Sequence, residues 1–106
     1  EIFHLLLENK RIELGKGVFQ NCSSLKEIIM PNSVKSIGNY SFYQCSSLEK
    51  VFISDSVKKI GDYSFYKCEL LREFVIPDSV ESIGKYSFGC CSSLKTIKIK
   101  EKDALL

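Results

Sequence analysis

The chain has 106 residues, a length that fits one domain. Its 44% hydrophobic and 26% charged residues lie in the ordinary range of soluble proteins. Fifteen basic and thirteen acidic residues leave a net charge of +2, which argues against nucleic acid as the main partner. No apolar run approaches the roughly 18–20 residues of a membrane span, which argues against insertion into a membrane.

The sequence is dominated by a unit of 23 residues that recurs in fixed register. The segment 37–53 recurs at 60–76 and 83–99, and a diverged copy lies at 14–30. The columns with this step include Phe19, Phe42, Phe65 and Phe88; Cys22, Cys45, Cys68 and Cys91; and Leu25, Leu48, Leu71 and Leu94. Such a period indicates stacked repeats, because one unit cannot bury its own apolar side and its neighbours must cover it.

Each repeat is expected to contribute one strand to a parallel sheet. The expected strands cover residues 2–7, 25–30, 48–53, 71–76 and 94–99. Val51 and Ile53 are two residues apart, the spacing of a strand with one buried face. A step of 23 places Leu5 in the column of Ile28. Five strands in one sheet are therefore predicted.

The rest of each repeat is predicted to return the chain to its starting side. Turn residues follow each strand, as in Pro31-Asn32 and Pro77-Asp78, and a second short strand should follow with Val34 and Ile37 facing inward. The glycine column at 15, 38, 61 and 84 suits a positive φ or a close approach between repeats. The segment after it is expected to form one short α or 3₁₀ turn on the convex side.

The expected organisation is a single array over residues 1–106. Its boundaries are a partial repeat 1–10, repeats 11–32, 33–55, 56–78 and 79–100, and the start of a further repeat at 101–106. No polar capping unit is recognisable at either end. Because solenoids usually have atypical terminal repeats, we expect a fragment of a longer array or ends that pair with something.

The pattern I-G-x-Y-S-F-x-x-C-x-S-L-x-x-I-x-I-P-x-S-V resembles the BspA-like leucine-rich repeat over nearly the whole chain. The resemblance implies an α/β repeat solenoid: a right-handed leucine-rich-repeat-like coil with a parallel sheet on its concave face, and short second strands and helical turns on its convex face. Ser41, Ser64 and Ser87 stand where the family usually has Ala. Similar proteins are mostly surface or secreted binding and adhesion proteins, with no catalytic residue in the shared motif.

The cysteines have three interpretations. One thiol per repeat fits a ladder of small, reduced, packed side chains. Neighbouring thiols in the ladder also come within disulfide range, and a metal site is a third alternative, although C-x-x-C pairs are missing. Cys90 shares its column with Asn21, Gln44 and Lys67, so it should face solvent and be able to form an intermolecular disulfide. A tolerated surface cysteine is the other reading.

No enzyme active site is expected. His4, the only histidine, is predicted to lie on the outer side of the sheet in the column of Glu27, away from the ladder cysteines. A Cys–His dyad within one molecule is therefore not available. No glycine-rich phosphate loop occurs. No cofactor and no metal are predicted.

The outer face of the sheet carries the candidate binding residues. Its predicted central column is Leu6, Ile29, Phe52, Val75 and Lys98, and four of these five are apolar on a face that the repeat does not need to bury. A simple preference for strand-forming residues would also explain them. Lys50 and Glu73 flank the column with alternating charge. Tyr40, Tyr63 and Tyr86 form a second ladder, which either packs over the edge of the repeats or binds a ligand.

These features predict a non-catalytic module that binds a protein or an extracellular-matrix ligand through the outer face. The alternative is a structural unit whose uncapped ends stack or dimerise. Family resemblance favours the cell surface or secretion, and a cytoplasmic location remains open.

Overall fold

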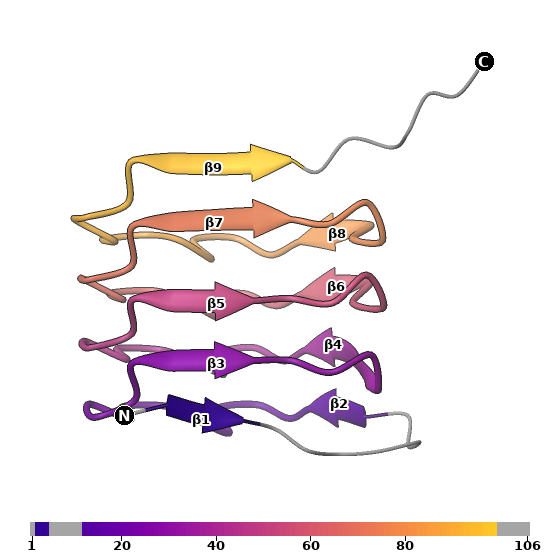
Figure 1. Cartoon of the computed structure of the whole chain (residues 1–106), viewed down its shortest axis with the longest axis horizontal. Helices are drawn as coiled ribbons and strands as arrows, with labels where there is room; N and C mark the ends of the chain where they lie inside the picture. Colours follow the sequence, from indigo (N-terminus) through magenta and orange to yellow (C-terminus); the bar gives the residue numbers. More distant parts are fainter. Residues whose placement is uncertain (1, 5–11, 100–106) are drawn as a thin grey trace.

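The computed structural model describes residues 2–4 and 12–99, as nine short strands joined by turns. The odd-numbered strands lie on one side of the stack of repeats and the even-numbered strands lie on the other (Figure 1). One side has β1 (Ile2–His4), β3 (Glu27–Ile29), β5 (Lys50–Phe52), β7 (Glu73–Ile76) and β9 (Thr96–Ile99). The other side has β2 (Ile12–Leu14), β4 (Val34–Ile37), β6 (Lys59–Ile60) and β8 (Ser82–Ile83).

All the strand pairs are parallel, and each strand pairs with its counterpart in a neighbouring repeat. The even-numbered strands form one sheet in the order β2-β4-β6-β8. The odd-numbered strands form two sheets, β1-β3-β5 and β7-β9, with no hydrogen-bonded ladder between β5 and β7. The prediction of one five-stranded sheet is therefore wrong at this position, although all five predicted strands are found.

The first repeat is also shifted from its predicted register. Between β3 and β5 the partners Ile28 and Val51 differ by 23 positions, as expected, but Phe3 is the partner of Ile28 in β1. The prediction that Leu5 lies in the Ile28 column is wrong, because the chain between β1 and β3 is two residues longer than one repeat. His4 lies opposite Ile29 instead of Glu27.

The predicted helical turn is not found; the described residues contain no helix. In segment 38–45, the N–H groups of Tyr40, Phe42 and Gln44 donate to carbonyl oxygens of the next repeat at 2.9, 2.7 and 2.8 Å. The N–H groups between them close β-turns within their own repeat. Tyr40 and Gln44 have φ of 61° and 57°, a left-handed conformation that interrupts any helix. The turn segments thus bond the repeats to one another, as the strands do.

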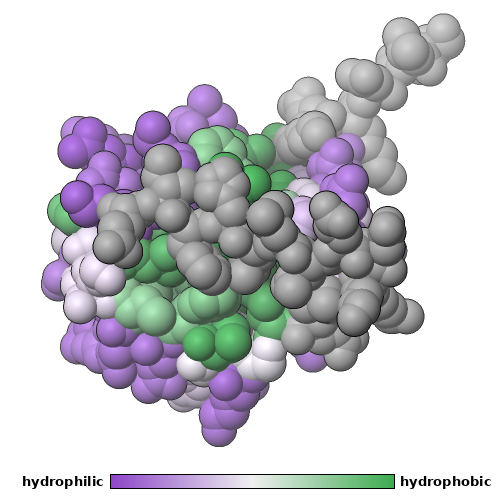
Figure 2. Space-filling model, turned by 60° about the horizontal axis from the view of Figure 1, so that its bottom comes forward, coloured by the Kyte–Doolittle hydropathy of each residue, from purple (hydrophilic) through white to green (hydrophobic). Residues whose placement is uncertain are grey.

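The core lies between the two sets of strands and the turn segments. Four phenylalanine rings run through it as a stack, with ring centroids 5.2 Å apart for Phe19 and Phe42, 5.1 Å for Phe42 and Phe65, and 5.7 Å for Phe65 and Phe88. Phe42 and Phe65 are fully buried. At the end of the stack that carries β1, hydrophobic residues gather in the middle and hydrophilic residues lie at the sides (Figure 2).

The glycine column is explained by close approach between repeats. A Cβ atom built on Gly61 would lie 2.6 Å from the backbone nitrogen of Asn39 and 2.7 Å from the carbonyl carbon of Gly38, both in the preceding repeat. None of the four column glycines has a positive φ. Of the two predicted reasons for this glycine column, only the steric one applies, and it applies to Gly38, Gly61 and Gly84 but not to Gly15, where a Cβ atom would meet nothing within 4 Å.

Candidate binding surface

The outer face is the solvent-facing side of β3, β5, β7 and β9, and the predicted central column lies on it. Ile29 pairs with Phe52 across β3 and β5, and Val75 pairs with Lys98 across β7 and β9. Phe52 is 51% exposed and Val75 is 41% exposed, while Ile29 is half-buried. The predicted fifth member, Leu6, lies outside the described residues. In the observed register of β1, the residue opposite Ile29 is His4.

Charged residues alternate beside this column. Glu27 lies opposite Lys50 across β3 and β5. The carboxylate of Glu73 forms an ion pair with Nζ of Lys98, at 3.1 Å. More than half of each side chain of that pair is exposed, so the pair contributes less than about 1 kcal/mol to stability. Its effect on the surface is to neutralise Glu73 and to turn the column from apolar to charged at β9.

A cleft opens on the outer face between β5 and β7, where the ladder is missing. It has a volume of about 500 Å³. Its apolar lining residues are Val51, Phe52, Ile53, Val75 and Pro77, and its charged ones are Glu49, Lys50, Asp55, Arg72 and Glu73. Figure 1 shows β5 and β7 more widely separated than β7 and β9. We call this opening the β5–β7 cleft.

The cleft reaches residues that belong to the inner side of the sheet. Val51 occupies the inward column of Ile28 and Phe74, which are 0% and 1% exposed, yet Val51 is only half-buried. Ile53 is also half-buried. The opening therefore exposes part of the core to the outer face.

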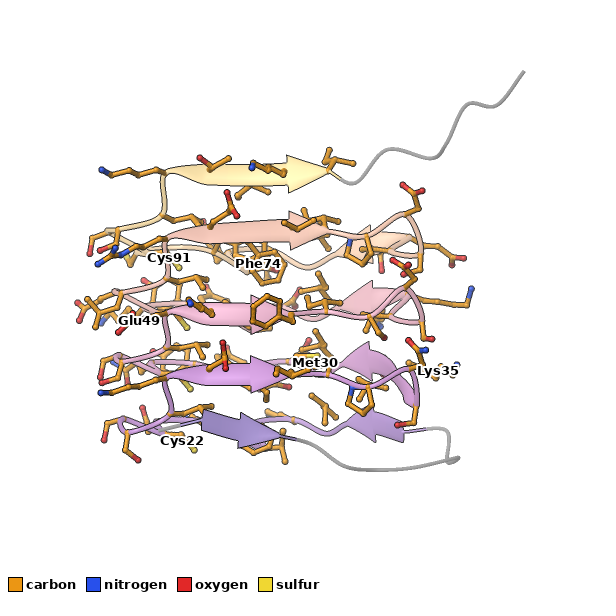
Figure 3. The ribbon with its side chains drawn as sticks, viewed as in Figure 1. Cys22, Met30, Lys35, Glu49, Phe74 and Cys91 are labelled. Atoms are coloured by element: carbon orange, nitrogen blue, oxygen red, sulfur yellow. The ribbon has the colours of Figure 1, made fainter. Side chains whose placement is uncertain are left out.

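We attribute the opening to Phe74. The other members of its column in β3, β5 and β9 are Ile28, Val51 and Ile97. The Phe74 ring packs edge-on against Phe65 at 5.0 Å and against Phe88 at 4.5 Å (Figure 3 labels Phe74 between β7 and β5). Because this ring is larger than the aliphatic residues in the rest of the column, and Val51 is the smallest of them, we infer that it keeps β7 from closing on β5. The cleft was not predicted from the sequence, where the one sign of it is this aromatic residue in an otherwise aliphatic column.

All five thiols are free in the described residues; Cys45 and Cys68 of the ladder are buried, and Cys22 and Cys91 at its ends are half-buried. Sγ of Cys45 donates to the carbonyl oxygen of Phe19 at 3.2 Å, and Cys68 and Cys91 repeat the same contact with later phenylalanines. Figure 3 shows Cys22 and Cys91 on the side of the stack where the odd-numbered strands begin. Burial raises the pKa of Cys45 from 9.0 to about 12 and raises the pKa values of Cys68 and Cys91 as well. These thiols are held protonated and are poor nucleophiles.

Thiol labelling should separate Cys90 from this ladder. Cys90 is exposed, and Cys45 and Cys68 are fully buried. With iodoacetamide at pH 8, we expect Cys90 to be alkylated first. Cys45 should react ~1000-fold more slowly than an ordinary thiol, because its raised pKa leaves that much less thiolate. Peptide mass spectrometry would measure this, with a Cys90→Ser chain and a guanidinium-unfolded sample as controls. Equal rates at Cys45 and Cys90 in the folded protein would contradict the ladder.

The tyrosine ladder is mainly a packing feature. Tyr40 stacks on Tyr63 with centroids 5.2 Å apart and planes 2° apart, and Tyr43 stacks on Tyr66 at 5.5 Å and 7°. Stacked rings cover one another's faces, so a ligand would meet mostly ring edges. Tyr86, at the end of the ladder, is the well exposed member. Of the two predicted roles, this geometry favours packing.

Metal and membrane sites are not found in the part of the chain that the structure describes. Within residues 2–4 and 12–99, no three His, Cys, Asp or Glu side chains are grouped to hold a metal ion. The same residues include no helix that is long and apolar enough to cross a bilayer.

Parallel strands that recur once per repeat, a buried leucine column and a phenylalanine stack define the leucine-rich repeat class of fold. The sequence profile of the BspA type leucine-rich repeat region matches residues 2–104 in six copies, and the chain belongs to this family. Among curated proteins, none matches the chain.

Solved structures show the same fold. A leucine-rich repeat protein from Bacteroides capillosus has 25% identity and a TM-score of 0.84, and the match covers 94% of this chain and 77% of that one. The leucine-rich repeat protein of T. pallidum has 24% identity and a TM-score of 0.71, over 91% and 57%. A leucine-rich cell surface protein from Faecalibacterium prausnitzii has 21% identity and a TM-score of 0.73, over 97% and 33%. The chain thus spans about a third to three quarters of these proteins. The family is one of protein-interaction repeats that are generally non-catalytic.

Proposed function

We propose that the chain is a non-catalytic module that binds a protein partner through the outer face of β3, β5, β7 and β9. The proposed contact residues are Ile29, Phe52, Val75, Lys98, Lys50 and Glu73, with Leu6 as a further candidate beyond the described residues. Phe52 and Val75 supply the apolar centre of this surface, and the charged residues form its rim.

The exposure of Phe52 and Val75 carries the proposal. Each is more than 40% exposed although neither is needed to complete the core, which the inward residues of the same strands fill. An apolar centre with a mixed-charge rim is the usual composition of a protein-binding surface. The balanced charge of the rim disfavours a polyanion such as nucleic acid.

An adhesion role at the cell surface is the biological setting that we propose. One structural neighbour is described as a cell surface protein. An extracellular-matrix protein is the partner class that this setting suggests.

Selection from a phage-displayed random peptide library would test the proposal. Wild-type protein is the target, and the Phe52→Ser/Val75→Ser double variant is the counter-target. We expect enriched peptides to bind the double variant at least about tenfold more weakly, since apolar residues at the centre of an interface supply most of its energy. A matched Tyr86→Ser variant, changed at an exposed aromatic residue away from the outer face, should bind normally. Enriched peptides that ignore the double substitution would refute the proposal.

A second candidate function is end-to-end assembly, favoured by the exposed apolar residues on β9. Ile97 is 46% exposed and Ile99 is 72% exposed, and the outer edge of β9 is unpaired within the described residues. Unpaired apolar edge strands are templates for pairing with another chain. Light scattering over a concentration series would show growth in mass that Ile97→Lys abolishes. A dimer that reductant splits would instead implicate a Cys90 disulfide, and a monomer throughout would dismiss both.

A further inference from the structure

We infer that the β5–β7 cleft is an anchor pocket for one aromatic side chain of an extended peptide segment in the protein partner. The inference rests on the proposed function and assigns a specific residue type to the centre of the outer face. The proposed occupant is a peptide segment and not a free small molecule.

The cleft is a local feature of this array. The even-numbered strands run as one uninterrupted sheet through the same repeats, so the array is intact on one side and open on the other (Figure 1). A volume of about 500 Å³ lies within the range of about 300–1,000 Å³ typical of ligand pockets. The opening is therefore large enough for a bulky side chain together with part of its main chain.

The walls favour an aromatic occupant. Val51 and Ile53 are half-buried at the inner side, and Phe52 and Val75 are exposed at the outer side. An aromatic ring brings the largest apolar area into such a pocket at the lowest entropic cost, and the ring of Phe52 offers it a favourable edge or face contact. Pro77, the residue directly after β7, completes an apolar wall.

The backbone around the cleft favours a peptide. Because β5 and β7 share no ladder, main-chain N–H and C=O groups along their facing edges are not paired with each other. Such groups require hydrogen-bond partners. The amide groups on either side of an anchored residue supply donors and acceptors at that position, as in other peptide recognition that uses strand edges.

The charges around the cleft favour a neutral occupant. Its lining includes three acidic residues, Glu49, Asp55 and Glu73, and two basic ones, Lys50 and Arg72. Lys98, ion-paired with Glu73, brings the basic count to three. An uncharged aromatic side chain flanked by neutral amides complements this balanced rim, and a highly charged segment does not.

The test is a titration of ¹⁵N-labelled protein with N-acetyl-tryptophan amide, followed by backbone amide chemical shifts. We expect saturable shifts confined to residues 49–55 and 72–77. N-acetyl-alanine amide should bind at least about tenfold more weakly because it lacks the ring, and free indole at least about tenfold more weakly because it lacks the amides. Absent shifts, shifts spread over the surface, or equal binding of either comparator would overturn the inference.

Two variants that close or fill the cleft make the test specific. Phe74→Ile replaces the residue that separates the strands, and Val51→Phe fills the inner side of the opening. Both variants should bind the probe about tenfold more weakly or worse. Tyr86→Ser, changed at an exposed residue away from the outer face, should bind it normally. Because either of these two variants alone could misfold, the dispersion of its amide spectrum is checked first. Probe binding is then compared with the wild type only for a variant that is folded.

Failure of the anchor and failure of the proposed function give different results. If selected peptides depend on Phe52 and Val75 but bind a folded cleft-filled variant normally, the anchor is wrong and the binding surface stands. If the tryptophan probe binds in the cleft but no displayed peptide depends on Phe52 and Val75, the protein-binding function is wrong.

Discussion

Replacing Phe65 by alanine should lower the free energy of unfolding by about 3–5 kcal/mol, the usual cost of removing a buried ring. Phe65 is fully buried, stacks between Phe42 and Phe88 at 5.1 and 5.7 Å, and meets Phe74 edge-on. Its loss would interrupt the phenylalanine stack at its centre and leave a cavity that repeats held by backbone bonds on several sides cannot close.

Chemical denaturation monitored by circular dichroism would measure this loss. The matched control is Phe52→Ala, the same substitution at a ring that is half exposed on the outer face. Phe52→Ala should cost less than about 1.5 kcal/mol, because about half of its apolar area is already in contact with water. Comparable losses for the two variants would show that the phenylalanine stack is not the core.

Replacing Gly61 by alanine is expected to lower the free energy of unfolding by about 2–3 kcal/mol. The added Cβ would lie 2.6 Å from the backbone nitrogen of Asn39 and 2.7 Å from the carbonyl carbon of Gly38. Backbone atoms cannot rotate away as a flexible side chain can. Neighbouring repeats would have to move apart, and the ladder between β4 and β6 would be strained along with them.

Gly15→Ala provides the control for Gly61. The two residues occupy the same column, but a Cβ atom on Gly15 meets nothing within 4 Å, and its φ is not positive. Alanine at this position should change stability by no more than about 1 kcal/mol, in the stabilising direction, because it restricts the unfolded chain. Thermal unfolding of the two variants gives the comparison. If Gly15→Ala is as harmful as Gly61→Ala, close approach between repeats is not the reason for the glycine column.

The sequence was sufficient to predict which residues face inward. The step of 23 positions predicted the columns, and the structure buries Phe42, Cys45 and Leu48 as expected. This works because every repeat has nearly the same neighbours, so one correct assignment holds for all. The strand on each repeat and the parallel pairing follow from the same regularity.

Predictions failed where the chain departs from its own period. The register of β1 depends on two extra residues between β1 and β3, which a fixed step cannot reveal. A short helical turn was predicted after the glycine column, but the left-handed conformations of Tyr40 and Gln44 produce consecutive β-turns there instead. Neither residue is a glycine, so composition gave no warning of a positive φ.

The candidate site was predicted only in outline. The positions of Ile29, Phe52 and Val75 on the outer face follow from alternation along each strand. The β5–β7 cleft does not, because it depends on the volume of Phe74 relative to Val51 in the inward column. Whether a larger side chain tilts its strand outward or repacks inside depends on the packing of Phe65 and Phe88 around it, which alternation does not describe.

The missing ladder between β5 and β7 has a mechanical consequence. The two repeats on either side remain joined by the pairing of β6 with β8 and by turn-segment hydrogen bonds such as Phe65 N–H to the carbonyl oxygen of Ser87 at 2.8 Å. These two repeats are bonded on the side of the even-numbered strands and on the side of the turn segments, and they are open only between β5 and β7. Bending the array at this point therefore widens or narrows the cleft, and a ligand that fills the cleft also fixes the bend.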